Sequence, residues 1–132
     1  MDLKNFAPKS DDIEVVVLHP GNGEPLTNKD GSQMTITLAA THSKEYKAIL
    51  HEQTDKRINL SKGSGQLEFK SKEMEEASLE ILAKATKSWN ITYDGAKPKL
   101  TVAKAKAIYE ELFWLKPQLE EAVTTTADFM NP

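Results

Sequence analysis

The chain has 132 residues, a formal net charge of −3 and 28% charged residues, and this length fits one domain with a small hydrophobic core. The mildly acidic balance gives no general reason to expect binding to nucleic acid or to an anionic membrane surface. Because the sequence contains no cysteine, disulfides, thiolate zinc sites, iron–sulfur clusters and cysteine nucleophiles are excluded.

Hydropathy gives no sign of a membrane segment. The longest uninterrupted apolar runs, such as residues 15–18, are far shorter than the roughly 20 residues that a membrane helix needs. Residues 1–12 also lack the apolar core of a signal peptide. These features predict a protein that stays in the cytoplasm and has no membrane partner.

The sequence pattern of the N-terminal part predicts two strands. Residues 13–18 are rich in β-branched side chains, and a turn-forming cluster at 19–25 follows them. A second turn at 28–31 precedes residues 33–38, in which polar and apolar side chains alternate as in a half-buried strand. Two strands alone are marginal in water, so this β-hairpin region, at about 11–40, needs cover from helices or from a neighbouring chain.

The middle of the chain predicts two helices with a break between them. A thin apolar stripe predicts a helix over 43–57. The polar, glycine-containing stretch at 59–70 predicts a flexible connection. From Ser71 onwards, apolar residues recur at three- and four-residue steps, and this strong helical pattern closes at Trp89.

Two shorter helices are predicted near the C-terminus. Thr101 is placed to cap the first, and Pro117 opens the second. Their apolar faces are formed by Ala105, Ile108, Tyr109 and Leu112, and by Leu119, Ala122, Val123, Thr126 and Met130. The predicted fold class is therefore α+β, an N-terminal antiparallel strand pair followed by a small bundle of about four helices. It forms a single domain over 1–132 whose helical part is at about 71–130.

No catalytic or metal-binding pattern is found. The histidines, His19, His42 and His51, include no pair at the i, i+4 spacing of a helical metal site. No serine stands in a G-x-S-x-G setting. The glycine turn at 21–23 does not open a helix, and that at 63–65 lacks the Lys-Ser/Thr ending of a phosphate-binding loop. We therefore assign no catalytic residue, cofactor or metal.

The clusters of charged residues are typical of solvent-exposed surfaces and not of binding sites. Carboxylates over 73–80 alternate with lysines along an amphipathic helix. Lysines at 97, 99, 104 and 106 lie near Tyr93 and form the one candidate for a nucleic-acid patch, but Glu110, Glu111, Glu120 and Glu121 follow and offset them. We expect no nucleic-acid partner.

Phe113-Trp114-Leu115 is a continuous apolar triplet that a narrow helical stripe cannot bury as a whole. Either the triplet forms a buried corner between two helices, which we favour, or part of it is exposed for a partner. Phe129 and Met130 raise the same question. The candidates for partner binding are therefore Phe113, Trp114, Leu115, Phe129 and Met130.

The sequence resembles the tail assembly chaperones of long-tailed bacteriophages and prophages, particularly the non-contractile group. The resemblance lies in VLHPGNGEPL at 17–26, in TITLAATHSKEYKAI at 35–49, and in ATKSWNITYDG, LTVAKAKAIYEELFWLKPQLEEAV and ADFM within 85–130. It covers most of the chain except the ends and the connection near 59–70.

The resemblance implies a protein that binds the phage tape-measure protein, keeps its long helical segments soluble during tail-tube assembly, and is absent from the mature virion. It implies action in the host cytoplasm and no enzymatic activity. In the family, the C-terminal extension of a longer form recruits tail-tube subunits, so these subunits are a further candidate partner, and we also expect the chain to self-associate. The family also has frameshifted longer forms, and this chain is similar to the short form.

Two other classes remain open. A structural tail component, such as a tube or connector subunit, predicts a larger β-sheet and stable rings or tubes. A small DNA-binding regulator needs a basic recognition helix, for which residues 102–112, with Lys104 and Lys106, are the one candidate.

Overall fold

The computed structural model describes residues 2–6, 11–64 and 71–124. A short 3₁₀ helix at Leu3–Phe6 precedes three strands and four helices. In chain order these are β1 (Asp12–Val16), β2 (Thr35–Ala39), α1 (Lys44–Ser64), α2 (Ser71–Ala85), β3 (Thr86–Asn90), α3 (Val102–Glu111) and α4 (Leu115–Thr124). The predicted α+β class, with an N-terminal antiparallel strand pair and four helices, is confirmed.

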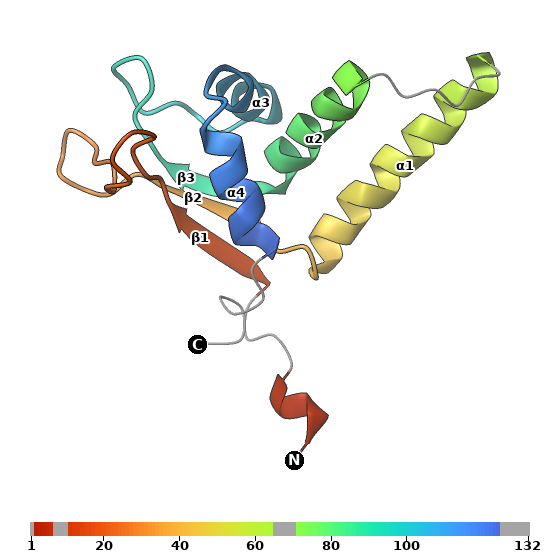
Figure 1. Ribbon diagram of the computed structural model, residues 1–132, viewed down its shortest axis with the longest axis horizontal. Coiled ribbons are helices and arrows are strands. Elements are labelled where there is room, and N and C mark those ends of the chain that lie inside the picture. The colour runs from red at the N-terminus through yellow and green to blue at the C-terminus, as the bar shows by residue number, and fades with distance from the viewer. Residues whose placement is uncertain (1, 7–10, 65–70, 125–132) are drawn as a thin grey trace.

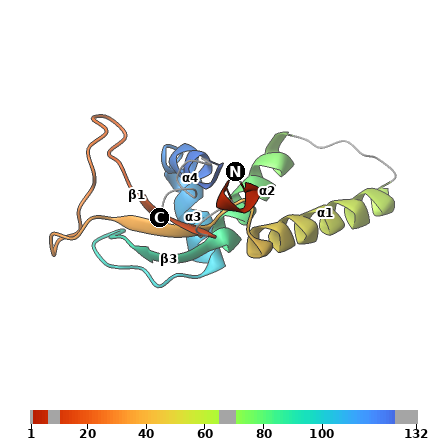
Figure 2. The same ribbon diagram turned by 90° about the horizontal axis from the view of Figure 1, so that it is seen from below.

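The strands form one antiparallel sheet in the order β1-β2-β3. Its register places Val15 opposite Ile36, and Ile36 opposite Trp89. The pattern of alternation along β2 directs Ile36 and Leu38 to one face, where helices α2, α3 and α4 pack (Figure 1). Helix α1 extends away from the sheet, as two perpendicular views show (Figure 2).

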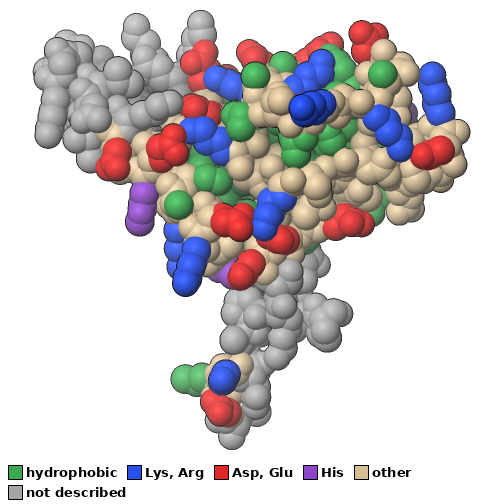
Figure 3. Space-filling model, turned by 180° about the vertical axis from the view of Figure 1, so that it is seen from behind, with side chains coloured by type: hydrophobic (Ala, Val, Ile, Leu, Met, Phe, Trp, Pro, Cys, Tyr) green, Lys and Arg blue, Asp and Glu red, His purple; other side chains and the backbone are tan. Residues whose placement is uncertain are grey.

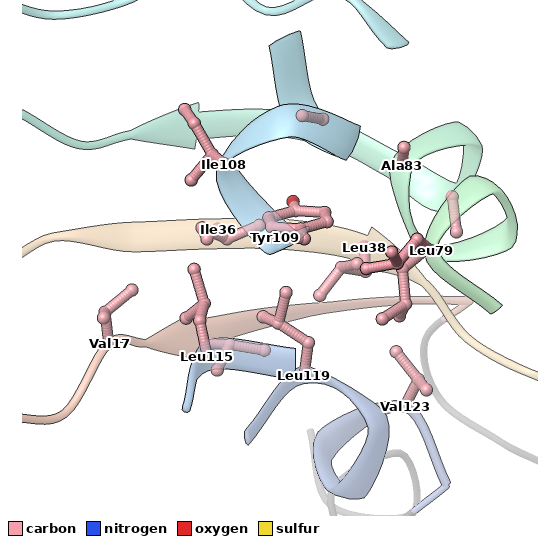
Figure 4. Close-up of a cluster of buried hydrophobic side chains, with 14 of the residues drawn as sticks. Val17, Ile36, Leu38, Leu79, Ala83, Ile108, Tyr109, Leu115, Leu119 and Val123 are labelled. Atoms are coloured by element: carbon pink, nitrogen blue, oxygen red, sulfur yellow. The ribbon is translucent and has the colours of Figure 1, made fainter. Parts of the chain in front are cut away.

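One hydrophobic core joins the sheet to these three helices. Figure 4 shows Tyr109 of α3 over β2. Leu115, Leu119 and Val123 of α4 lie next to β1 in the same view. The three α4 residues recur at four-residue steps, so one stripe of the helix is buried on the sheet. The α3 stripe predicted from the sequence is also found, with Ala105, Ile108 and Tyr109 buried and Leu112 half-buried.

Tyr109 brings a hydroxyl into this core. Its side chain is 1% exposed, and the phenol oxygen lies 2.7 Å from Oγ1 of Thr86. The Thr86 hydroxyl in turn donates to the Leu82 carbonyl oxygen at 2.8 Å, so the buried polar groups are satisfied. Burial raises the pKa of Tyr109 to about 12, against a smaller lowering by the Thr86 hydrogen bond.

Tyr109→Phe is expected to reduce the loss of stability in strong alkali. The pKa of Tyr109 is raised in the folded state. The contribution of the neutral phenol to the free energy of unfolding is therefore fully present below the unfolded pKa near 10, and it is lost as the pH rises towards 12. Urea unfolding of both proteins between pH 9 and pH 12 measures this, since the difference between them isolates Tyr109. Parallel pH profiles would contradict the expectation.

The helical pattern predicted to close at Trp89 is wrong in its last turn. Helix α2 ends at Ala85, and Thr86–Asn90 forms β3, which the sequence did not predict. Three- and four-residue spacing places Ala85 and Trp89 on one helical face, but pairing with β2 decides the local structure. The predicted helical part, 71–130, therefore contains a strand.

The first helix is longer than predicted. The sequence predicts a helix over 43–57 and a flexible connection over 59–70, but α1 continues to Ser64. Neither glycine nor proline interrupts residues 44–62, so the polar composition alone does not end the helix. Residues 65–70 of the predicted connection lie outside the described residues.

The predicted cap at Thr101 and the predicted turn at Asp94-Gly95 are found. The Thr101 hydroxyl accepts a hydrogen bond from the Lys104 N–H at 3.1 Å. Asp94 and Gly95 both have positive φ, 53° and 82°, in a tight turn. The predicted start of the last helix at Pro117 is two residues late, because α4 begins at Leu115, and Pro117 is tolerated as its third residue since the first-turn N–H groups have no intrahelical partner. Within the described parts of the chain, no helix has the length and apolar content needed to cross a membrane.

Candidate functional site

The corner between α3 and α4 carries three of the five predicted contact residues. Phe113 is 81% exposed, Trp114 is half-buried and Leu115 is 2% exposed. Phe129 and Met130 lie outside the described residues. Of the two interpretations of the triplet, partial exposure is therefore the one found, and the favoured fully buried corner is wrong for Phe113.

Backbone geometry at the corner explains this division. The Leu112 N–H closes α3 by donating to the Ile108 carbonyl oxygen at 2.9 Å, and the Leu115 N–H donates to the Leu112 carbonyl oxygen at 2.9 Å. Phe113 and Trp114 thus form the turn between two helices. Leu115 begins the buried stripe of α4 and is removed from the surface candidates, because it packs in the core.

The loop before α3 holds this helix in place. The Tyr93 hydroxyl donates to the Glu111 carboxylate, which raises the pKa of Tyr93, with burial adding to the shift. The Lys104 ammonium lies 5.0 Å from the centre of the Tyr93 ring. Trp89 Nε1 donates to the Pro98 carbonyl oxygen at 2.9 Å. These contacts tie both ends of α3 to the segment that leaves β3.

A side-chain amide fixes α4 to the end of β1. Gln118 Oε1 accepts from the Leu18 N–H, and Gln118 Nε2 donates to the Leu18 carbonyl oxygen, both at 3.0 Å. The side chain therefore pairs with the backbone as a neighbouring strand would. Sequence reasoning missed this pair, since no local pattern links residues 100 positions apart. Phe113 thus precedes a helix that is anchored by packing and by two side-chain hydrogen bonds, and an anchored backbone lowers the entropic cost of engaging a partner.

Helix α1 contributes a polar interface. Lys84 Nζ lies 2.7 Å from Glu52 Oε1, and Lys87 Nζ lies 3.2 Å from Glu45 Oε1. Of residues 44–55, whose side chains the structure describes, Gln53 is the only one fully buried, at 6% exposure. Its Nε2 has no hydrogen-bond partner among the described residues. This arrangement is costly, because a buried unpaired amide loses its hydration.

Gln53→Leu is expected to raise the free energy of unfolding by about 1–2 kcal/mol, since it removes the unpaired buried donor and keeps a side chain of similar size. Chemical denaturation measures this change. Thr54→Leu, at the neighbouring exposed position, serves as the control for a general gain in helix propensity. Equal stabilisation by both variants would contradict the role given to Gln53.

The loops opposite α1 are occupied by their own contacts. His19 Nδ1 accepts from the Gly21 N–H at 2.9 Å and from the Asn22 N–H at 3.3 Å, so these donors are engaged within the turn. Lys97 pairs with Asp30 at 3.1 Å. The pKa of Asp30 is lowered by hydrogen bonds from Ser32 first and from Lys97 next. These contacts stabilise the loops themselves.

Neither a metal centre nor a strong basic patch emerges from the described residues. No group of three His, Asp or Glu side chains among them is arranged to hold a metal ion. Of the four candidate lysines, Lys97 is paired with Asp30 and Lys104 lies over Tyr93. Acidic and basic side chains are interspersed over the face shown in Figure 3.

Comparisons with protein-family models, with curated proteins and with solved structures found no match.

Proposed function

We propose that the chain is a tail assembly chaperone of a long-tailed, non-contractile bacteriophage or prophage. In this proposal it binds the tape-measure protein in the host cytoplasm, assists tail-tube assembly, is absent from the mature virion and has no enzymatic activity. The sequence resemblance supports this role, and the single observation that carries it is Phe113, a large aromatic side chain that is 81% exposed at the corner between α3 and α4.

The exposed aromatic group fits a protein that shields apolar helices. Burial of a Phe side chain at an interface contributes about 1.5–3 kcal/mol, and aromatic residues are enriched in the centres of interfaces. Trp114 is half-buried beside Phe113 and extends the apolar surface. A long amphipathic helix of a tape-measure protein presents the matching apolar stripe.

A structural tail component is the second candidate. The observation that favours it is the sheet itself, whose outer strands β1 and β3 are edge strands. Edge strands can join copies of a chain into rings or tubes. Both strands have only five residues, which limits the hydrogen bonds that such a contact gains. The DNA-binding alternative is less favoured, because Lys104 of the candidate helix is engaged with Tyr93.

Co-expression with overlapping fragments of a candidate tape-measure protein, followed by pull-down, tests the proposal. A fragment that is insoluble alone is expected to become soluble in a complex with this chain. Phe113→Ala is expected to weaken that complex by tenfold or more, about 1.4 kcal/mol or greater, as for a central interface residue.

Met74→Ala is the matched control, because it truncates a large apolar side chain on α2 that is 51% exposed. It is expected to bind like the parent chain, and both variants are expected to keep the parent's thermal unfolding profile. Failure to retain any fragment, or full binding by a folded Phe113→Ala variant, would count against the proposed function.

A further inference from the structure

A small open pocket lies where α1, α2 and α4 meet. Its volume is about 90 Å³. Helix α2 lies between the other two helices in Figure 1. Tyr46 comes from α1, Ile81 and Leu82 come from α2, and Glu120 and Val123 come from α4. The pocket is thus built from three helices and is separate from the Phe113 corner.

The walls of the pocket combine an apolar floor with polar groups, which are the Glu120 carboxylate at the rim and the hydroxyls of Ser78 and Thr124. Leu82 and Val123 are 3% and 2% exposed and belong to the core, and Ile81 is half-buried above them. The Glu120 side chain is 51% exposed. A side chain that lies across the pocket therefore contacts hydrocarbon at the floor and a carboxylate at the edge.

Electrostatics at the rim favour a cation. Burial, and next the negative charge of Glu120, raise the pKa of Tyr46, so the phenol stays neutral beside the carboxylate. The positive group facing Glu120 is Lys116, one turn earlier on α4, whose Nζ lies 3.5 Å from the carboxylate. The pair is partly exposed, with side-chain exposures of 23% for Lys116 and 51% for Glu120, and an i, i+4 pair of this kind contributes little, so a second cation can compete for the carboxylate.

We propose that this pocket takes a lysine or arginine side chain from an amphipathic helix of a partner protein. The methylene stem packs on Ile81 and Val123, and the charged head binds Glu120 and the face of the Tyr46 ring. An acidic side chain is rejected by Glu120. The inference rests on the proposed function, since it names the chemistry of the helical partner.

The position of the pocket fits a single helix that touches both surfaces. Phe113 precedes α4 by two residues, and Glu120 lies in its second turn. The five helical steps from Leu115 to Glu120 rise about 8 Å, and Phe113 lies in the turn before them, so a partner helix of two or three turns is long enough to reach from the Phe113 corner to the pocket. In this arrangement the Phe113 side chain is buried against the partner helix. The pocket fixes the register of that helix by binding one of its basic residues.

Titration of the ¹⁵N-labelled full chain with two synthetic amphipathic helical peptides tests the proposal. The peptides are identical except that one carries a lysine and the other norleucine at a single position between the apolar stripe and the polar face. The lysine peptide is expected to shift the amide resonances of Tyr46, Ile81 and Val123, and to bind at least fivefold tighter than the norleucine peptide.

Glu120→Gln is expected to remove that preference. Glu121→Gln is the matched control, because it deletes the same charge one residue further along α4, outside the pocket lining, and keeps the preference. Equal affinity of the two peptides, equal effects of the two variants, or no shift at about 1 mM lysine peptide would overturn the inference. The peptides are not phage sequences, so these results are independent of whether a tape-measure fragment is retained in the pull-down.

Discussion

Leu119→Ala is expected to lower the free energy of unfolding by about 3 kcal/mol, within the range of 2–5 kcal/mol for leucine truncations in a core. Leu119 is 0% exposed and lies at the centre of the buried stripe of α4, between Leu115 and Val123. The truncation removes apolar burial and leaves a cavity between α4 and the sheet. Equilibrium denaturation of the parent chain and of the variant, followed by the same probe, measures the loss.

Thr124→Ala, at an exposed position of the same helix, is the control. It separates the loss of core packing from a general change in the stability of the helix. It is expected to change stability by about 0.5 kcal/mol or less. If Leu119→Ala changed the free energy of unfolding by no more than Thr124→Ala, α4 would not be packed on the sheet as described.

Asn28→Asp is expected to destabilise the fold by about 3 kcal/mol or more, although the two side chains have nearly the same shape. Asn28 is 4% exposed, and its Nδ2 lies 3.3 Å from the Ser32 carbonyl oxygen and 3.2 Å from that of Asn90. Its Oδ1 accepts from the Thr92 hydroxyl at 2.6 Å. An aspartate places a negative oxygen against two carbonyl oxygens and loses the donor that joins the two loops.

Thermal unfolding near neutral pH measures this effect, with two reference variants. Asn28→Ala is expected to cost less, about 1–3 kcal/mol, because it removes the hydrogen bonds without burying a charge. Asn22→Asp makes the same substitution in the exposed first loop, where Oδ1 accepts from the Glu24 N–H at 2.9 Å and an aspartate keeps that acceptor. Comparable destabilisation at positions 22 and 28 would contradict the network described.

Local patterns in the sequence were sufficient to predict much of the fold. The alternation around Ile36 and Leu38 identifies β2, and the cap at Thr101 identifies the start of α3. Strand β3 was missed, because its residues continue the apolar spacing of α2 and only pairing with β2 distinguishes the two states. The length of α1 was missed because polar composition was interpreted as a break in the helix.

The candidate site was only partly accessible from sequence. The apolar triplet marks the corner, but which of its members face solvent depends on the stripe that begins at Leu115 and on the turn that closes α3. The Gln118–Leu18 pair and the Glu120 pocket join segments far apart in the chain. Neither spacing nor composition identifies such contacts, since they arise from the packing of α4 against β1 and α2.

Size-exclusion chromatography with light scattering tests the proposed chaperone role most directly, on the purified chain alone and after mixing with a candidate tape-measure fragment. The account predicts a soluble complex of defined stoichiometry containing both chains, and a chain that by itself forms no tubes. Assembly of the chain alone into rings or tubes, with no complex formed with any fragment, would contradict the chaperone role and favour a structural tail component.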